Sequence, residues 1–282
     1  MKFGLFGINF GACADPEAAR RVARAAEEGG FESLWTGEHV VLPDPQAPPS
    51  PSPPDVPFLD PAVALAHVAA HTKTIRLGTG IIILPQRNPL ILAKELASVD
   101  VVSGGRLLFG LGIGYLKAEF DALGVSFDDK GARATEYLAA ILALWTQPQP
   151  RYEGRFVAFS GIQAQPRPVQ QPHPPIVIGG HSEPAFRRAV EHANGWYGFM
   201  LDLERTAKCI EGLREAQKKY PRPAALGPLE ISVTPRAKLD HDTVQRFADL
   251  GVKRLIVHRP RPTADEIIAD VREISATLVG KS

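Results

Sequence analysis

Cysteine is scarce in this sequence, and metal-binding patterns are missing. The 282 residues include two cysteines, Cys13 and Cys209, which lie far apart without a CxxC pair or a histidine at ligand spacing. This usage argues against a disulfide framework and favours a reducing compartment. No HExxH, EF-hand or paired Cys/His spacing occurs either, so we expect no metal site.

Clusters of one charge and long apolar runs are also missing. The formal net charge is +1 and no segment gathers lysine and arginine, so we expect neither nucleic acid nor an anionic membrane as a partner. No apolar run reaches the ~18 residues that a membrane span needs, and the first residues do not read as a signal peptide. These absences predict a cytoplasmic protein that acts on a small-molecule substrate.

What the sequence does contain is an alternation of short apolar runs with amphipathic stretches, which is typical of parallel strands joined by crossover helices. The predicted strands are Lys2–Gly7, Ser33–Gly37, Ile75–Ile83, Leu107–Gly112, Pro175–Gly179, Gly195–Phe199, Leu229–Pro235 and Arg254–His258. The predicted helices are Ala18–Glu28, Ala62–His71, Leu90–Val102, Ala132–Leu144, Ala185–His192, Leu203–Lys219, His241–Asp249 and Thr263–Leu278. Eight such units favour one α/β domain over residues 1–282, a (β/α)8 TIM barrel, over an open doubly wound sheet.

Two proline-rich insertions, Pro43–Phe58 and Arg151–Pro174, interrupt this pattern. The second is predicted to contain a hairpin at Tyr152–Phe156. Long irregular segments in compact domains are often lids over a ligand site. We therefore expect both insertions at the C-terminal face of the barrel, where they would shape a substrate pocket.

The end of the second strand carries the first group of candidate site residues. Trp35-Thr36-Gly37-Glu38-His39 brings together an aromatic ring, a carboxylate and an imidazole, and ligands of such barrels bind at the carboxyl ends of the strands. Imidazole exchanges protons near neutral pH. His39 and Glu38 are therefore the candidate catalytic residues, although a His beside a Glu can equally be a structural pair.

Glycines mark the ends of the third and fourth strands. Thr79-Gly80-Ile81 would let the backbone approach a flat ligand, and Gly110, Gly112 and Gly114 alternate before Tyr115. The alternation lacks the spacing of a dinucleotide fingerprint, but it would leave room on one face for a ring system. A bulge or tight packing between strand and helix is the alternative at these glycines.

The fifth strand ends in Gly179-Gly180-His181-Ser182, directly before a helix. Free N–H groups at such a helix start, assisted by the Ser182 hydroxyl, can hold a phosphate, although an ordinary N-cap is the alternative. No nucleophile elbow or Walker loop is present. The chain therefore offers little reactive chemistry of its own, which favours a bound organic cofactor.

Taken in order, these segments resemble the luciferase-like monooxygenase superfamily, in its branch of coenzyme F420-dependent oxidoreductases. The resemblance covers nearly the whole chain and is carried by Leu34–Pro43, Leu77–Ile81, Leu111–Leu116 with Glu119-Phe120, Leu144-Trp145-Thr146, Pro172–Gly180 and Asn194-Gly195-Trp196. It implies a (β/α)8 barrel with a bulge and a non-prolyl cis peptide near residues 79–81. It also implies a flavin or deazaflavin at the C-terminal face, and relatives of this kind are often homodimers.

The resemblance further implies which residues meet the cofactor. His39 would face the ring, and Gly179–Ser182 would hold its phosphate. Coenzyme F420 is favoured over FMN by the Gly37-Glu38-His39-Val40 run, and the implied reaction is hydride transfer between C5 of the deazaflavin and a small organic substrate. An FMN-dependent monooxygenase is the alternative; a non-catalytic cofactor-binding barrel and a phosphate-binding isomerase are two others. The cofactor-binding residues predicted here are Trp35, Thr79, Gly80, Ile81, Gly112, Gly114, Tyr115, Gly179, Gly180, His181 and Ser182.

Overall fold

Eight parallel strands close into a barrel in the computed structural model, which describes residues 1–281. Pairing runs from β1 through β2, β3, β5, β8, β9 and β10 to β11, and β11 returns to β1. This confirms the predicted TIM barrel. The barrel strands are β1 (Lys2–Phe6), β2 (Ser33–Thr36), β3 (Arg76–Thr79), β5 (Leu107–Gly112), β8 (Ile176–Gly179), β9 (Gly195–Leu201), β10 (Glu230–Pro235) and β11 (Arg254–Val257).

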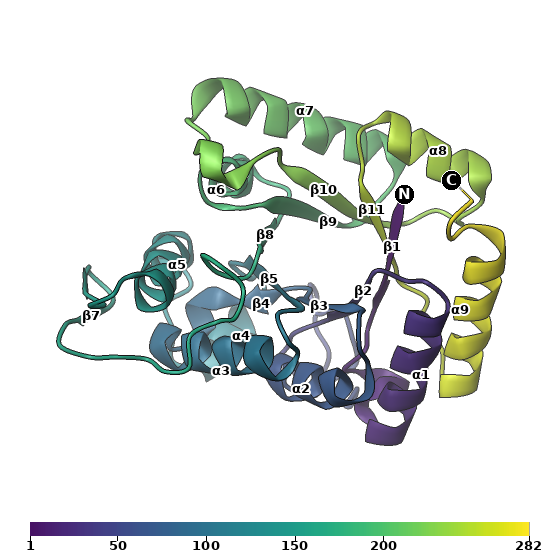
Figure 1. Cartoon of the computed structure of the whole chain (residues 1–282), viewed down its shortest axis with the longest axis horizontal. Helices are drawn as coiled ribbons and strands as arrows, with labels where there is room; N and C mark the ends of the chain where they lie inside the picture. The colour runs from purple at the N-terminus through teal and green to yellow at the C-terminus, as the bar shows by residue number, and fades with distance from the viewer. Residues whose placement is uncertain (282) are drawn as a thin grey trace.

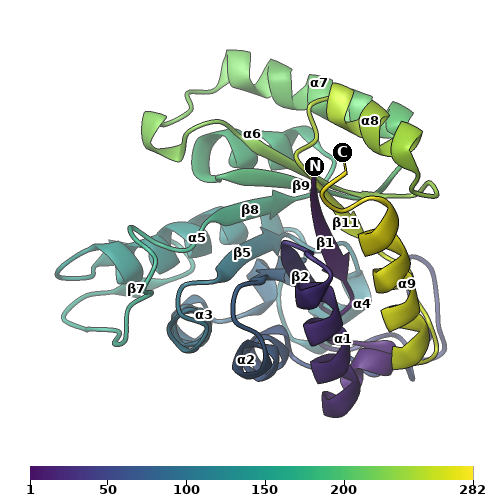
Figure 2. The same ribbon diagram turned by 45° about the vertical axis from the view of Figure 1, so that its right-hand side comes forward.

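Helices surround the strands on the outside (Figures 1 and 2). Several begin where the sequence predicts, because Asp15 and Asp60 accept N–H bonds of the first turn while Pro16 and Pro61 need no acceptor. No helix within residues 1–281 is long and apolar enough to cross a membrane. The helices are α1 (Pro16–Glu28), α2 (Pro61–His71), α3 (Pro89–Val102), α4 (Lys117–Ala122), α5 (Lys130–Thr146), α6 (Glu183–His192), α7 (Leu203–Lys219), α8 (His241–Asp249) and α9 (Ala264–Thr277), with short 3-10 turns η1 (Gly11–Ala14), η2 (Leu84–Gln86) and η3 (Ala224–Leu226).

Two differences from the expected elements lie next to the site. The predicted strand Ile75–Ile83 is divided into β3 and the short β4 (Ile82–Ile83), with a cis peptide bond between Gly80 and Ile81. Helix α4 was not predicted, because six residues are too few for a clear helical period. The non-prolyl cis bond lies where the family resemblance implies one.

The interior of the barrel is filled by side chains. Trp35, Leu108, Val177, Tyr197 and Ile256 form a buried cluster, and Phe6 and Ile81 pack against it. A second and larger apolar cluster fills the space between strands and helices. Because the barrel has a solid core, a ligand has to bind above it, at the carboxyl ends of the strands.

The first insertion lies at that end, as predicted. Phe58 at its end stacks on Phe10 with ring centroids 4.8 Å apart, and the two residues form an antiparallel bridge. Buried Asn9 secures the region, since its amide donates to the carbonyls of Gly37 (2.9 Å) and Leu59 (2.7 Å). The insertion is therefore joined to the loops after β1 and β2.

The second insertion was wrongly placed by the sequence analysis. Its Gln170 bonds to Asp100 at the end of α3 and to the carbonyl of Leu107 at the start of β5, which is the amino-terminal end of the barrel. The hairpin of β6 (Tyr152–Glu153) and β7 (Ala158–Phe159) exists, but it packs on α5 through Glu136. Figure 1 shows it at the outer edge of the molecule, beyond α5. A segment that joins a helix to the next strand begins and ends at this end of a barrel, so it does not cover the ligand face.

Candidate active site

Aromatic side chains gather at the carboxyl ends of the strands. Phe6 is central among them, with ring centroids 5.0 Å from Phe199, 5.1 Å from His258 and 5.7 Å from Phe10. Phe58 from the first insertion stacks on Phe10. We call Phe6, Phe10, Phe58, Phe199 and His258 the mouth cluster. Such a group offers apolar faces and edges to a flat ligand.

His39 lies at the edge of the mouth cluster, where its ring meets Phe58 edge to face at 5.7 Å. Tyr115, which is about half exposed, lies 6.3 Å from it on another side. The Nδ1 atom of His39 is 3.4 Å from Oε2 of Glu119, whose side chain is fully buried. Glu119 Oε1 also accepts the Val40 backbone N–H at 2.6 Å. The carboxylate thus fixes both the loop after β2 and the orientation of the imidazole.

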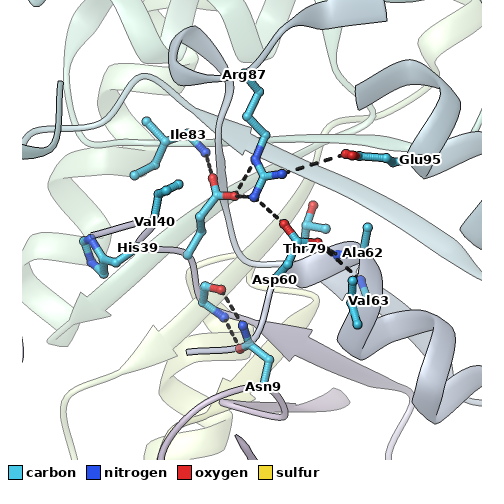
Figure 3. A network of polar contacts seen from close by, with 12 residues as sticks. Asn9, His39, Val40, Asp60, Ala62, Val63, Thr79, Ile83, Arg87 and Glu95 are labelled. Atoms are coloured by element: carbon cyan, nitrogen blue, oxygen red, sulfur yellow. Dashed lines mark hydrogen bonds and ion pairs between the residues drawn. The ribbon is translucent and has the colours of Figure 1, made fainter. Parts of the chain in front are cut away.

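Glu38 does not pair with His39, which corrects the predicted partnership. Its carboxylate accepts the Ile83 backbone N–H and two N–H groups of Arg87, one of them from Nε at 2.7 Å. In Figure 3, His39 points away from Arg87 and from this network. Burial raises the pKa of Glu38, and the charge of Arg87 opposes the rise. The neighbouring residue turns the other way because consecutive side chains of an extended segment alternate.

Arg87 joins this network to the surrounding helices. It donates at 2.7 Å to Asp60, which caps α2, and its guanidinium lies 3.8 Å from Glu95 on α3 (Figure 3). Through the Ile83 N–H, Glu38 also holds the chain directly after the Gly80–Ile81 cis bond. The geometry therefore makes Glu38 a positioning residue for the segment 80–83.

Thr79 has a structural place as well. Its fully buried hydroxyl donates to the Gly110 carbonyl at 2.6 Å and accepts the Gly110 N–H at 2.8 Å, so the side chain continues the pairing of β3 with β5. A Cβ on Gly110 would overlap the Thr79 carbonyl oxygen. Glycine at position 110 thus permits a close approach of the two backbones.

Ile81 occupies the space that the sequence analysis assigned to a ring system. A Cβ on Gly112 would overlap Ile81 Cδ1, and a Cβ on Gly179 would lie 2.8 Å from the same atom. The predicted open face of the glycine-rich strand is therefore filled by this side chain. Since Ile81 remains partly exposed above the buried cluster, the residue that a ligand can meet here is Ile81 rather than Gly112 or Gly179.

Gly114 is likewise surrounded by protein. It has a positive φ of 73°, and a Cβ there would lie 2.6 Å from Ile83 and 2.8 Å from Phe120. Its freedom of φ lets the chain turn from β5 toward α4, which carries Glu119. Gly114 therefore contributes to the site by placing that carboxylate.

The segment Gly179–Ser182 lies at the start of α6, as predicted, but Ser182 does not cap the helix through its side chain. Gly180 adopts a φ of 124°, and its carbonyl accepts the Trp196 indole N–H at 2.8 Å. His181 is exposed, and its Nε2 accepts the Phe199 N–H at 3.2 Å. Burial of part of the ring and the nearby charge of Arg205 lower the pKa of His181. The Ser182 hydroxyl is left available to a ligand.

Trp35 does not reach the mouth. It is fully buried, and its indole N–H donates to the Ser33 hydroxyl at 2.8 Å inside the barrel. Its ring occupies the space beside Gly4 and Gly78, where added Cβ atoms would come within 2.9 Å of its atoms. The structure thus places Trp35 in the barrel core beneath Gly80 and Ile81, and not at the mouth.

Several residues that the fold brings to the mouth were not predicted from the sequence. Glu119 follows His39 by 80 positions. The only sequence signal for Glu119 was the Glu119-Phe120 pair, which is part of the family resemblance. The aromatic residues come from the ends of β1 and β9 and from three loops, so no local spacing reveals them. His258 could have been found, because it directly follows the last strand. The residues missed are Phe6, Phe10, Phe58, Glu119, Phe199 and His258.

Within residues 1–281 no group of three or more His, Cys, Asp or Glu side chains could hold a metal ion. The site therefore offers an imidazole with a buried carboxylate, an apolar and aromatic surface, and a helix start with a free hydroxyl. This combination suits proton transfer beside a flat organic ligand.

Comparisons with known proteins agree with this architecture. The uncharacterized protein Mb0978c of Mycobacterium bovis is 31% identical over 289 residues, with 99% of each chain covered. The oxygenase component of the flavin-dependent trigonelline monooxygenase of Acinetobacter baylyi is 31% identical over 201 residues, which are 68% of this chain and 52% of that protein. An F420-dependent secondary alcohol dehydrogenase has the same fold, with a TM-score of 0.78, 14% identity and 98% of each chain covered.

The model of one protein family matches residues 1–273, which is nearly the entire chain. Its description is luciferase-like monooxygenase. The family match and the fold agree with the resemblance found in the sequence, and the chain belongs to the luciferase-like monooxygenase family.

Proposed function

We propose that the protein is an F420-dependent oxidoreductase that transfers a hydride between the C5 atom of the deazaflavin and a small organic substrate. The observation that carries this proposal is the pair of His39 and buried Glu119 at the edge of the mouth cluster. When bound, the deazaflavin would supply a hydride donor or acceptor that reacts poorly with oxygen.

The residues of the site fit such a group. Ile81 and Phe6 present an apolar surface directly above the filled barrel, on which a flat ring can lie. The Ser182 hydroxyl makes no capping bond, and the start of α6 faces the same end of the barrel, so both can hold a phosphate. Tyr115 and Phe58 beside His39 would exclude water from the reacting atoms.

His39 is placed to move the proton that accompanies hydride transfer. Its Nδ1 faces Glu119, whereas no protein atom of residues 1–281 bonds to Nε2. With Nδ1–H directed at the carboxylate, Nε2 can accept the hydroxyl proton of an alcohol as its carbon loses a hydride. In the reverse direction the protonated ring can donate to a carbonyl oxygen. Glu119 would hold the ring in this tautomer and orientation.

An FMN-dependent monooxygenase is a second candidate. It is favoured by the similarity to the flavin-dependent trigonelline monooxygenase, whose matched region covers 68% of this chain at 31% identity. The same aromatic and apolar surface would accept the flavin ring. The two candidates therefore differ in the cofactor and in the need for oxygen.

Titration of the purified protein with coenzyme F420 and with FMN, followed by ring fluorescence, tests the cofactor. We expect saturable binding of F420 with a lower Kd than that of FMN. Binding of FMN without binding of F420 would replace the first candidate by the second.

Replacement of His39 tests the chemistry separately from binding. With reduced F420 and a panel of small aldehydes and ketones, the H39Q variant should lose on the order of 100-fold or more in turnover while F420 binding stays the same. H241Q, at an exposed position on α8, is the matched control. Equal turnover of H39Q and H241Q would remove His39 from the mechanism.

A further inference from the structure

A cavity of about 490 Å³ opens beside the mouth cluster and is not used by the mechanism above. It lies between the carboxyl ends of β9 and β10, the residue after Gly180, and the first turns of α7. The residues that line it are His181, Phe199, Met200, Leu201, Arg205, Lys208, Cys209 and Arg236. We call it the rim cavity.

The wall of the rim cavity is positively charged, because three of its residues are basic and none is acidic. Lys208 is bound to Glu204 at 2.7 Å, outside the lining. Arg205 and Arg236 are exposed, and neither guanidinium has a hydrogen-bond or ion-pair partner within residues 1–281. The nearby carboxylate of Asp202 is occupied by the Arg205 backbone N–H, as the cap of α7. Two guanidinium groups therefore remain available to an anion.

The backbone of this wall is held in an unusual conformation. Met200 has a φ of 54° and is the sole non-glycine residue with positive φ in residues 1–281. The register between β9 and β10 also shifts between Val233 and Pro235. A left-handed conformation is strained for a non-glycine residue, and such residues collect at ligand sites. Backbone bonds fix the wall, including that from Arg236 N–H to the Leu201 carbonyl at 2.9 Å.

The rim cavity borders the predicted cofactor site. Phe199 lines it and also belongs to the mouth cluster, where its ring lies 5.0 Å from Phe6. His181 lines it and belongs to the segment expected to hold a phosphate. A molecule that occupies the mouth can therefore extend an anionic group into the cavity.

From these observations we propose that the rim cavity is a subsite for a phosphate or carboxylate group, bound by Arg205 and Arg236 with Lys208 nearby. The proposal rests on the proposed function in one respect, since the molecule that carries the group would occupy the mouth. Its source is either the side chain of the cofactor or the substrate.

Calorimetric titration with inorganic pyrophosphate, at constant ionic strength, tests the subsite without a cofactor. The double variant R205M/R236M should bind pyrophosphate on the order of tenfold more weakly than the unmodified protein, because two charge-assisted bonds are lost. The matched control is R24M/R272M, which removes from α1 and α9 two exposed arginines whose side chains have no hydrogen-bond or ion-pair partner within residues 1–281. Equal affinities of the two double variants would overturn the proposal.

Four further titrations identify the source of the anion. They compare the binding of FMN with that of riboflavin, and the binding of F420 with that of its deazaflavin ring carrying only the ribityl chain. If R205M/R236M weakens FMN or F420 but not the truncated forms, the cofactor carries the group. If no titration changes while pyrophosphate binding to the cofactor-loaded protein is weakened, the substrate carries it. Failure to bind any of the four would count against the proposed function, whereas the pyrophosphate result would still decide the subsite.

Discussion

The two sides of the ligand face differ in how their polar groups are satisfied. On the side of β2, β3 and β5, Glu38 and Arg87 bind each other, and Glu119 binds the loop of His39. On the side of β8, β9 and β10, Arg205 and Arg236 face a cavity without partners in residues 1–281. A buried charge with a partner fixes geometry, whereas an exposed charge without one is free to meet a ligand. The first side is thus built for a fixed position of His39 and Ile81, and the second for recognition.

Removing Arg87 should affect the paired side most. R87M leaves the carboxylate of Glu38 buried without its cation, which should lower the free energy of unfolding by about 3–5 kcal/mol. The pKa of Glu38 is already raised by burial and rises further without Arg87, so the variant should lose stability as the pH rises above the ordinary carboxyl pKa of 4.5. Urea unfolding at several pH values measures this, with R272M as the control. A loss that is small and independent of pH would mean that Glu38 is not held as a buried charge.

The close approach of β3 and β5 on the same side should be almost as sensitive. In G110A the new methyl group would overlap the Thr79 carbonyl, and overpacking of this kind costs about 1–3 kcal/mol or more. G131A in the first turn of α5 is the control, because the atom near its Cβ is the flexible end of Arg188. Thermal unfolding of the two variants compares them. Similar melting temperatures would show that the strands can separate at Thr79 without cost.

His258 lies between the two sides and should link stability to pH. Burial lowers its pKa below the ordinary value of 6.5, so the unfolded chain takes up the proton first as the pH falls. Stability should therefore decrease from about pH 7.5 downward until the folded pKa is passed. H258Q should show less of this decrease than the unmodified protein in urea unfolding at about pH 7.5 and 5.5. An unchanged pH dependence in H258Q would assign the effect to other groups.

The smallest effect on folding is expected on the basic side. Because Arg205 and Arg236 have no partners to lose, R205M and R236M should leave the unfolding midpoint unchanged in urea, in contrast to R87M. A clear loss of stability in either variant would show that these arginines have a structural role. It would also remove the distinction between the two sides.

The barrel could be predicted from the sequence because its evidence is local. Apolar runs such as Leu107–Gly112 and Arg254–Val257 occur as strands where they were expected, and the residues Asp15 and Asp60 mark true helix starts. Strand β3 is the exception, since the apolar run continues past Gly80 although the backbone turns there. An apolar run in the sequence does not predict a change of backbone direction within that run.

The contacts of the site depend on positions far apart in the chain, and these were the weaker predictions. Glu38 and Glu119 are both close to the loop of His39, but only the fold shows that Glu38 turns to Arg87 and Glu119 to the imidazole. The glycines suggested open space for a ring, yet that space belongs to Ile81. A glycine in the sequence does not reveal which neighbouring side chain fills the space beside it.

The fit of Ile81 over Gly112 and Gly179 has a consequence for how this family varies. Three strand ends share one small volume, so a larger residue at either glycine requires a smaller one at position 81. In relatives, these three positions should change together rather than singly. The surface under the ligand would then change shape through compensating changes in side-chain size at these three positions, while the barrel strands below keep their register.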